Sequence, residues 1–237
     1  MDSMEEFQPF NDRMHPWAAD PKTIGALAGT QLAIISSVGS AGEAADEPQQ
    51  VARHQELNEE IRKAGAIPKF KNFLESGAVD RLHTAVVALS FMSTDNHACA
   101  QEMLQIDMMP ILIPHLKSPK QGMRAAVATT LRNISCVSNE AREKLADAGG
   151  LTEMVKQLEL DEDNADLKLE AILNLQDILE EEDGPINEKV AKVFKFKTNV
   201  MDLLKATVDK EDSADEVEMD VNNQAEELLE KLEAVEE

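Results

Sequence analysis

The residues with the clearest chemical potential in this sequence are two cysteines, five histidines and many carboxylates. His97 and Cys99 stand two positions apart, and such a pair supplies two of the three or four ligands that a metal site needs. No further ligand follows at a useful spacing, so we interpret both as loop or helix-surface residues. His115 lies between Pro114 and Leu116, and we expect it to pack or to face solvent rather than to act as a base. Neither pattern predicts a metal site.

The motifs of the common catalytic and cofactor sites are missing. The sequence has no GxGxxG or GxxxxGK[ST] loop for phosphate groups and no GxSxG nucleophile motif. Acidic clusters at 159–166 and 209–220 lack the residue order of a calcium-binding loop. Cys99 and Cys136 form no CxxC pair, and we expect them to be small core residues. The sequence therefore predicts a protein that is not an enzyme and binds no cofactor or metal.

The net charge of −23 is concentrated towards the C-terminus. Residues 1–158 carry a net charge of −5, and residues 159–237 carry a net charge of −18. A field of this sign repels nucleic acid and anionic membrane surfaces and favours a basic partner. The N-terminus lacks a signal sequence and a myristoylation glycine, and no apolar run could span a bilayer. We expect an acidic protein of the cytoplasm, with the nucleus as the alternative, that has no membrane anchor.

Helices are the elements that must position any binding residues, because an aromatic content of 3% is unusual for a β-rich fold. From about residue 51 onwards, apolar residues recur with helical spacing. Gly65, Asp107 and Gly149 stand at equivalent breaks in this pattern, 42 residues apart. A helical period of this length is typical of a solenoid, in which each unit buries its apolar face only against its neighbours.

The predicted domain organisation has three parts. Residues 1–21 form an irregular N-terminal arm, and residues 22–50 form a capping helix with an acidic loop. Residues 51–237 form the repeat domain, with units at about 51–94, 95–138, 139–184 and 185–237. After an acidic insertion near Asp161, within the third predicted unit, the repeat spacing lengthens by two residues.

Three short motifs resemble the armadillo-repeat family. They are Ala64-Gly65-Ala66-Ile67-Pro68 at a break, Leu116-Lys117-Ser118-Pro119 at a turn, and Thr130-Leu131-Arg132-Asn133-Ile134 near the end of a long helix. The resemblance covers roughly residues 51–205. It implies an all-α fold, a right-handed superhelical armadillo-type solenoid of about four units plus an N-terminal capping helix. The third helix of each unit would line a concave groove.

The resemblance also implies where a partner would bind. In peptide-binding members of the family, an Asn near the end of each third helix binds the peptide backbone, and a Trp four residues earlier flanks its side chains. Only Asn133 matches this Asn, while Phe91, Asp177 and, if the last unit aligns in the same way, Lys231 replace it elsewhere. The Asn–Trp ladder of the importin type is therefore absent.

The partner-binding groove would be lined by residues at and near these positions, which are Val87, Phe91, Thr129, Asn133, Cys136, Leu173 and Asp177. An acidic contact surface would follow at Glu180, Glu181 and Glu182. Arg132 is expected to point partly away from the groove and to form surface ion pairs.

We expect a non-enzymatic protein–protein interaction module, an adaptor or regulatory subunit. Its predicted groove is partly apolar at the N-terminal end and acidic at the C-terminal end, which suits a protein partner with a basic or a mixed apolar and basic segment. Two alternatives stay open. One is a nucleotide-exchange factor or cochaperone for a heat-shock ATPase, a class that also includes short armadillo proteins. The other is a structural subunit of a large assembly.

Overall fold

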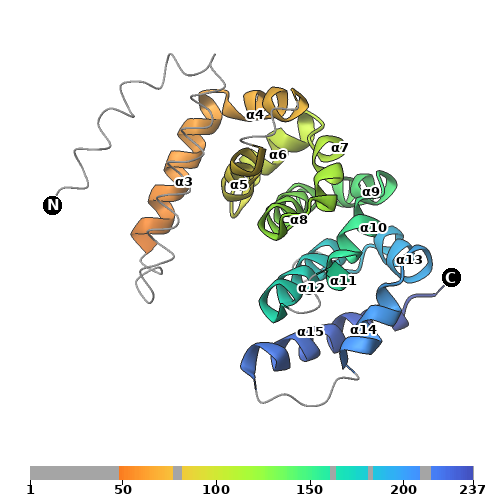
Figure 1. Ribbon diagram of the computed structural model, residues 1–237. Coiled ribbons are helices and arrows are strands. Elements are labelled where there is room, and N and C mark those ends of the chain that lie inside the picture. The colour runs from red at the N-terminus through yellow and green to blue at the C-terminus, as the bar shows by residue number, and fades with distance from the viewer. Residues whose placement is uncertain (1–47, 77–81, 161–163, 181–183, 209–214, 237) are drawn as a thin grey trace. The chain divides into compact units, whose positions relative to one another are not determined.

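The computed structural model describes residues 48–76, 82–160, 164–180, 184–208 and 215–236 (Figure 1). Within these ranges every extended regular element is a helix, and one isolated antiparallel bridge joins Glu180 to Ile186. The predicted all-α fold is therefore confirmed. The predicted arm at 1–21 and the capping segment up to residue 47 lie outside the described residues.

The described helices are short and follow one another closely. In chain order they are α3 (Pro48–Lys63), α4 (Ala66–Glu75), α5 (Leu82–Ser93), α6 (His97–Gln105), α7 (Met109–Leu112), the 3-10 helix η3 (Ile113–Lys117), α8 (Gln121–Ser135), α9 (Asn139–Asp147), α10 (Gly150–Val155), α11 (Gln157–Leu160), α12 (Ala165–Leu179), α13 (Glu188–Lys197), α14 (Val200–Val208) and α15 (Glu216–Glu233).

Left-handed backbone marks each of the three predicted breaks. Gly65, Asp107 and Gly149 have φ angles of 75°, 60° and 76°. This conformation reverses the chain after a helix, and glycine adopts it without the steric cost that a Cβ atom brings. Asp107 adopts it as well, because a short polar side chain tolerates this region better than most, and its carboxylate pairs with Lys144. The 42-residue period of the sequence is therefore a period of the backbone.

Side-chain caps begin many of the longer helices. Asn96, Ser138, Asn164 and Asn187 each accept a hydrogen bond from the backbone N–H three residues later, and Asp215 caps α15 in a similar way. Each cap satisfies a helix N–H that has no partner inside its helix and contributes about 1 kcal/mol. Of the helices that carry predicted groove residues, α12 begins at such a cap, Asn164, whereas α8 begins without a side-chain cap.

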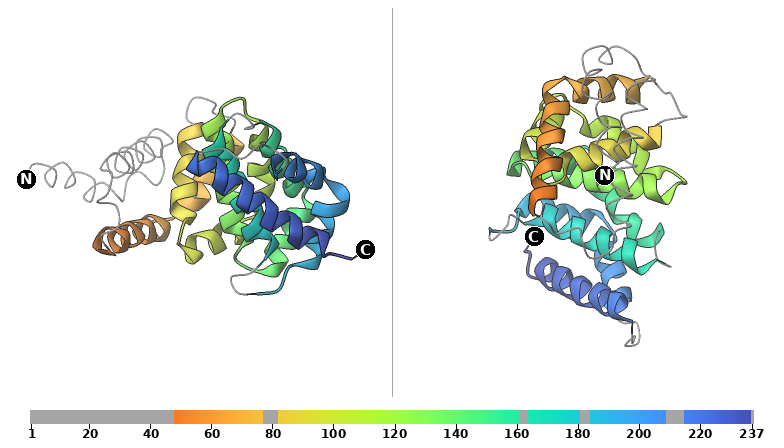
Figure 2. Two further views of the ribbon diagram at one scale, coloured as in Figure 1. Left: turned by 90° about the horizontal axis from the view of Figure 1, so that it is seen from below. Right: turned by 90° about the vertical axis from the view of Figure 1, so that its left-hand side faces the viewer.

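Contacts divide the described residues into two compact units, with the boundary between Ile106 and Asp107. From here on, the first unit and the second unit are these two, not the four predicted repeat units. In the first unit, α6 packs against α3, α4 and α5. In the second unit, α8 packs against η3, α9 and α12, and α12 packs in turn against α15. Figure 2 shows α15 beside α14, against which it also packs. The helices of residues 95–138 are therefore shared between the units, with α6 in the first and α7, η3 and α8 in the second.

The buried core follows the predicted register of the long helices. Leu89 and Met92 on α5, Leu131 and Ile134 on α8, and Leu175 and Ile178 on α12 are all buried. One helix differs from the prediction. The segment that begins at Met109 is a single α-turn followed by the 3-10 helix η3, not one continuous α-helix. Pro114 has no N–H to donate to the preceding turn, which explains why regular α-helix ends there.

The left-handed breaks generate a stability prediction. Replacing Gly149 by alanine should lower the free energy of unfolding by about 1 kcal/mol, because an L-residue is strained at this φ. A Cβ atom there would meet nothing within 4 Å, so the loss would report backbone strain and not a clash. Urea denaturation followed by circular dichroism measures the change.

Gly122 provides the matched control, since it lies inside α8 and has no positive φ. The same substitution there should raise the stability by about 0.5–1 kcal/mol. Equal effects at the two glycines would contradict the assignment of the break to backbone conformation.

Candidate protein-interaction surface

The four residues that align with the family's groove Asn share one structural position. Phe91, Asn133, Asp177 and Lys231 each lie two residues before the last residue of their helix, which is α5, α8, α12 and α15 respectively. We call these four the ladder residues. Because the helices end at the same offset from them, they are structurally equivalent although their chemistry differs completely.

The first unit contains one ladder residue. Val87 and Phe91 lie one turn apart on α5, and both side chains are half-buried. The backbone carbonyl of Phe91 accepts a hydrogen bond from Asn58 Nδ2 at 3.2 Å, which ties the end of α5 to α3. This part of the predicted groove is apolar, as expected from its sequence.

The second unit brings the middle of the predicted groove together around Arg132. Arg132 Nη1 donates to Asn133 Oδ1 at 2.7 Å, and its Nε lies 2.9 Å from Asp177 Oδ2. Cys136 Sγ lies 3.3 Å from the carbonyl oxygen of Asp177. The expected ion pair of Arg132 therefore exists, but it points to two ladder residues and not away from them. One cation thus connects the ends of α8 and α12.

Thr129 and Leu173 occupy the positions at which the family carries Trp. Thr129 Oγ1 donates to Glu170 Oε1 at 2.7 Å, which forms a second link between α8 and α12. Leu173 is 41% exposed, one of few large apolar side chains described as exposed. It lies one turn before Asp177, so an apolar contact and a carboxylate lie next to each other on α12.

The predicted acidic contact surface is only partly described. Glu181 and Glu182 lie outside the described residues. Glu180 accepts a hydrogen bond from Lys231 Nζ, which also pairs with Glu227 at 2.7 Å. Burial by itself would lower the pKa of Lys231, but its hydrogen bonds to Glu180 and Glu227, together with their charges, raise it above 10.5. Lys231 therefore connects α12 to α15 as Arg132 connects α8 to α12.

A buried arginine binds the backbone at the C-terminal end of α12. Arg142, which is 4% exposed, donates through Nη2 to the carbonyl oxygens of Asp177 and Glu180 at 3.4 and 3.2 Å. The last carbonyl groups of a helix have no partner inside the helix, and a cation at this end also opposes the helix dipole. Arg142 therefore fixes the backbone that carries Asp177 and Glu180.

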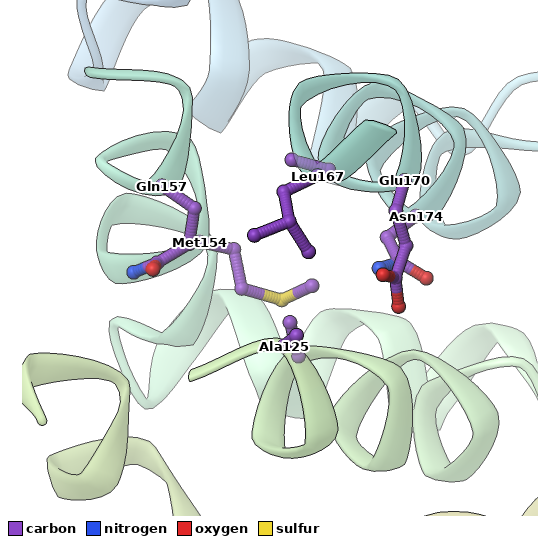
Figure 3. A pocket seen from close by; sticks show the side chains of 8 residues that line it. Ala125, Met154, Gln157, Leu167, Glu170 and Asn174 are labelled. Carbon is purple, nitrogen blue, oxygen red and sulfur yellow. The ribbon is translucent and has the colours of Figure 1, made fainter. Parts of the chain in front are cut away.

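A small cavity lies between α8 and α12 in the same unit. It has a volume of about 20 Å³ and is lined by Ala125, Ala128, Met154, Gln157, Leu167, Glu170, Ala171 and Asn174. Figure 3 shows Met154 and Leu167 pointing into it, with Glu170 and Asn174 along α12. This volume holds one water molecule or a methyl group, so it is too small for a cofactor.

The two thiols lie in environments that disfavour the thiolate. Burial raises the pKa of Cys99 to about 12 and also raises that of Cys136. Cys99 is fully buried, as predicted, but Cys136 is half-buried. Burial lowers the pKa of His115. Among the described residues, no three His, Cys, Asp or Glu side chains gather as a metal site would require. None of the described helices has the length and apolar character to cross a membrane.

Comparison with solved structures assigns the family. The chain is 36% identical to the armadillo-repeats-only protein from Plasmodium falciparum, over 93% of this chain and 85% of that one, with a TM-score of 0.70. The chain belongs to the armadillo-repeat family. Its fold is an armadillo-type α-solenoid, as the sequence motifs predicted. No family model matches the sequence, and a search of curated proteins found no match either.

Two engineered or designed proteins share the fold at lower identity. One is an engineered protein with 18% identity and a TM-score of 0.62, covering 99% of this chain and 93% of its own. The other is a designed armadillo repeat protein in complex with the peptide (KR)4, with 19% identity and a TM-score of 0.63, covering 94% of this chain and 87% of its own. In this armadillo chain, the binding role of the ladder residues remains a prediction.

Sequence reasoning named the two cations of this surface but missed the partners that they bind. The two bridging side chains are Arg132 and Lys231. Among the carboxylates, Glu170 accepts a hydrogen bond from Thr129, and Glu227 pairs with Lys231. Lys231 was identifiable from its alignment with Asn133. The direction of Arg132 was not, because its partner Asp177 is 45 residues away in the sequence.

The Lys231 bridge generates a prediction about stability and pH. Replacing Lys231 by methionine keeps most of the buried stem and removes the charge, and it should lower the free energy of unfolding by about 1 kcal/mol or less at neutral pH. Because the pKa of Lys231 is raised in the folded state, its contribution is present below 10.5 and is lost as the pH rises through the raised value. Urea denaturation at neutral pH and above 10.5 tests this.

Lys192 is the control, since it is exposed and has no ion pair recorded within the described ranges. Its replacement by methionine should change the stability by less than about 0.5 kcal/mol at either pH. A Lys231→Met deficit that persisted unchanged at high pH would show that the ion pairs do not cause it.

Proposed function

We propose that this armadillo chain is a non-catalytic protein-interaction module, an adaptor or regulatory subunit. Its second unit would bind an extended protein segment that carries lysine or arginine side chains next to an apolar one. The observation that carries the proposal is the pairing of Leu173 and Asp177 on α12. Both side chains are substantially exposed, at 41% for Leu173 and 48% for the side chain of Asp177.

The charge of the surrounding helices supports a basic partner. Glu170 and Asp177 lie on α12, Glu180 directly follows α12, and Glu227 lies on α15. Each already binds a hydrogen-bond donor or cation of this chain. Carboxylates with such contacts show that the local geometry accommodates an N–H donor. The C-terminal part of the chain is also the more acidic part, which accelerates encounter with a basic partner.

The solved structures support the same class of partner indirectly. A designed armadillo repeat protein of similar fold forms a complex with (KR)4, a peptide of alternating lysine and arginine. Only Asn133 of this chain matches the Asn of the family ladder. We therefore propose that contacts between carboxylates and the partner's side chains replace part of the recognition of the peptide backbone. We place this interaction in the cytoplasm. Within the described residues, no contact favours the exchange-factor or assembly-subunit alternative.

The proposal predicts a specific loss on neutralising Asp177. Fluorescence anisotropy with a labelled (Lys-Arg)4 peptide would measure the dissociation constant of the wild type and of Asp177→Asn. We expect the variant to bind about three- to tenfold more weakly, because one partly exposed ion pair is worth about 1 kcal/mol. Raising the salt concentration should weaken the wild type more than the variant, since salt screens this contact.

A matched control is necessary because any chain of charge −23 attracts such a peptide. Asp202 on α14 is exposed, and no ion pair is recorded for it in the described part of the chain. Asp202→Asn makes the same charge change, and we expect it to weaken binding by less than about twofold. Equal losses for Asp177→Asn and Asp202→Asn would reduce the interaction to general attraction and would refute the proposed surface.

A further inference from the structure

The two cations of the predicted surface are bound to the same carboxylates that the proposed function assigns to a partner. Arg132 Nε lies 2.9 Å from Asp177 Oδ2, and the Arg132 side chain is 33% exposed. Lys231 binds Glu180 and Glu227 and is 24% exposed. Both are chemically the side chains, arginine and lysine, that a basic partner segment would present.

The geometry of Arg132 resembles recognition of a foreign arginine. The planar guanidinium group donates to an amide oxygen, Asn133 Oδ1, and lies beside a carboxylate oxygen, Asp177 Oδ2, at 2.7 and 2.9 Å. The contact with Asn133 is a hydrogen bond, whereas Nε makes no hydrogen bond within the described residues, so its contact with Asp177 is a charge contact. The two acceptors are ladder residues on successive helices, at the positions where the family binds its ligands. Arg132 therefore occupies acceptor groups at two ladder positions.

Lys231 repeats the arrangement one step further along the chain. Its ammonium group lies between a carboxylate of α12 and a carboxylate of α15, and it is itself the ladder residue of its helix. Between α8 and α12, and again between the end of α12 and α15, carboxylates are thus bound by a cation of this chain. An ion pair that is partly exposed is worth little, so each cation is displaceable at modest cost.

We propose that Arg132 and Lys231 are built-in competitors, which occupy the acceptor groups of this surface until a partner with clustered basic side chains displaces them. This inference rests on the proposed function and adds its selectivity. A segment with one basic side chain would gain one contact while it displaces an equivalent one, and so would gain little. A segment with several cations would displace both competitors and add the contacts of its other side chains and backbone.

The competition has a counter-intuitive consequence, because removing a chain contact should strengthen binding. The apparent dissociation constant of a site exceeds its intrinsic value in proportion to the fraction of time for which the site is closed to the ligand. Arg132→Gln removes the competitor and also removes a positive charge that repels an incoming cation. We expect the variant to bind (Lys-Arg)4 about three- to tenfold more tightly than the wild type does.

The experiment compares five proteins by fluorescence anisotropy with labelled (Lys-Arg)4, which are the wild type, Arg132→Gln, Asp177→Asn, the double variant Arg132→Gln with Asp177→Asn, and Lys192→Gln. The last is the control for net charge, because Lys192 is an exposed lysine on α13, a helix without a ladder residue. Lys192→Gln should tighten binding by less than about twofold. Circular dichroism confirms that each variant is folded.

The double variant isolates the competition from general electrostatics. If Arg132 acts by occupying Asp177, its removal should tighten binding in the wild type but have only the effect of Lys192→Gln when Asp177 is already neutral. Tightening by Arg132→Gln that is no greater than that by Lys192→Gln would overturn the inference. Weaker binding by Arg132→Gln would also overturn it and would identify Arg132 as a positioning residue for Asp177.

These outcomes differ from those that refute the proposed function. If Asp177→Asn lowers the affinity more than Asp202→Asn does, the binding surface holds, whatever Arg132→Gln shows. If no variant binds the peptide, or if all respond only to net charge, the binding surface and the competition both fail. An independent reading comes from a peptide with a single arginine, which should bind the wild type barely and should gain about the same three- to tenfold factor from Arg132→Gln.

Discussion

Burial between neighbouring helix groups is the constraint on which this structure depends. In the part of the chain that the structure describes, the apolar faces of the short helices are buried against neighbouring helices, as in other solenoids. Leu131 and Ile134 on α8, like Leu175 and Ile178 on α12, are buried by such packing. The left-handed residues Gly65, Asp107 and Gly149 return the chain at a constant interval and so keep these faces in register. The residue two places before the end of α5, α8, α12 and α15 has the same position relative to its helix end, although the spacing between these residues lengthens towards the C-terminus.

The surface chemistry is a consequence of this repetition. A scaffold that presents equivalent positions allows their side chains to change without loss of the fold, and here Asn133, Asp177 and Lys231 differ in charge and in hydrogen-bonding capacity. The changed residues do not stand alone, since Arg132 connects the first two and Lys231 connects Glu180 to Glu227. In the second unit the charges of the ladder are therefore coupled across helices.

Much of the fold could be predicted from the sequence, because its signals are local and periodic. The 42-residue spacing of the breaks, the buried pairs of the long helices and the armadillo motif around Asn133 all follow from residues close together in the chain. The direction of Arg132 and the pairing of Glu180 with Lys231 could not be predicted. Their partners are 45 and 51 residues away, and an exposed side chain adopts the rotamer that the nearest counter-charge selects. The change to a 3-10 helix after Leu112 had a visible cause in Pro114, but its extent depended on packing against α8.

The central claim is that the second unit binds a basic segment across the ends of α8, α12 and α15. Photo-crosslinking locates the bound peptide directly, without altering the protein. A (Lys-Arg)4 peptide with a photoreactive residue at its centre would be bound, irradiated and mapped by mass spectrometry. The account predicts crosslinks concentrated around Leu173 and Asp177 on α12 and at the end of α8. Crosslinks concentrated on α9 and α13, which carry no ladder residue, would contradict it.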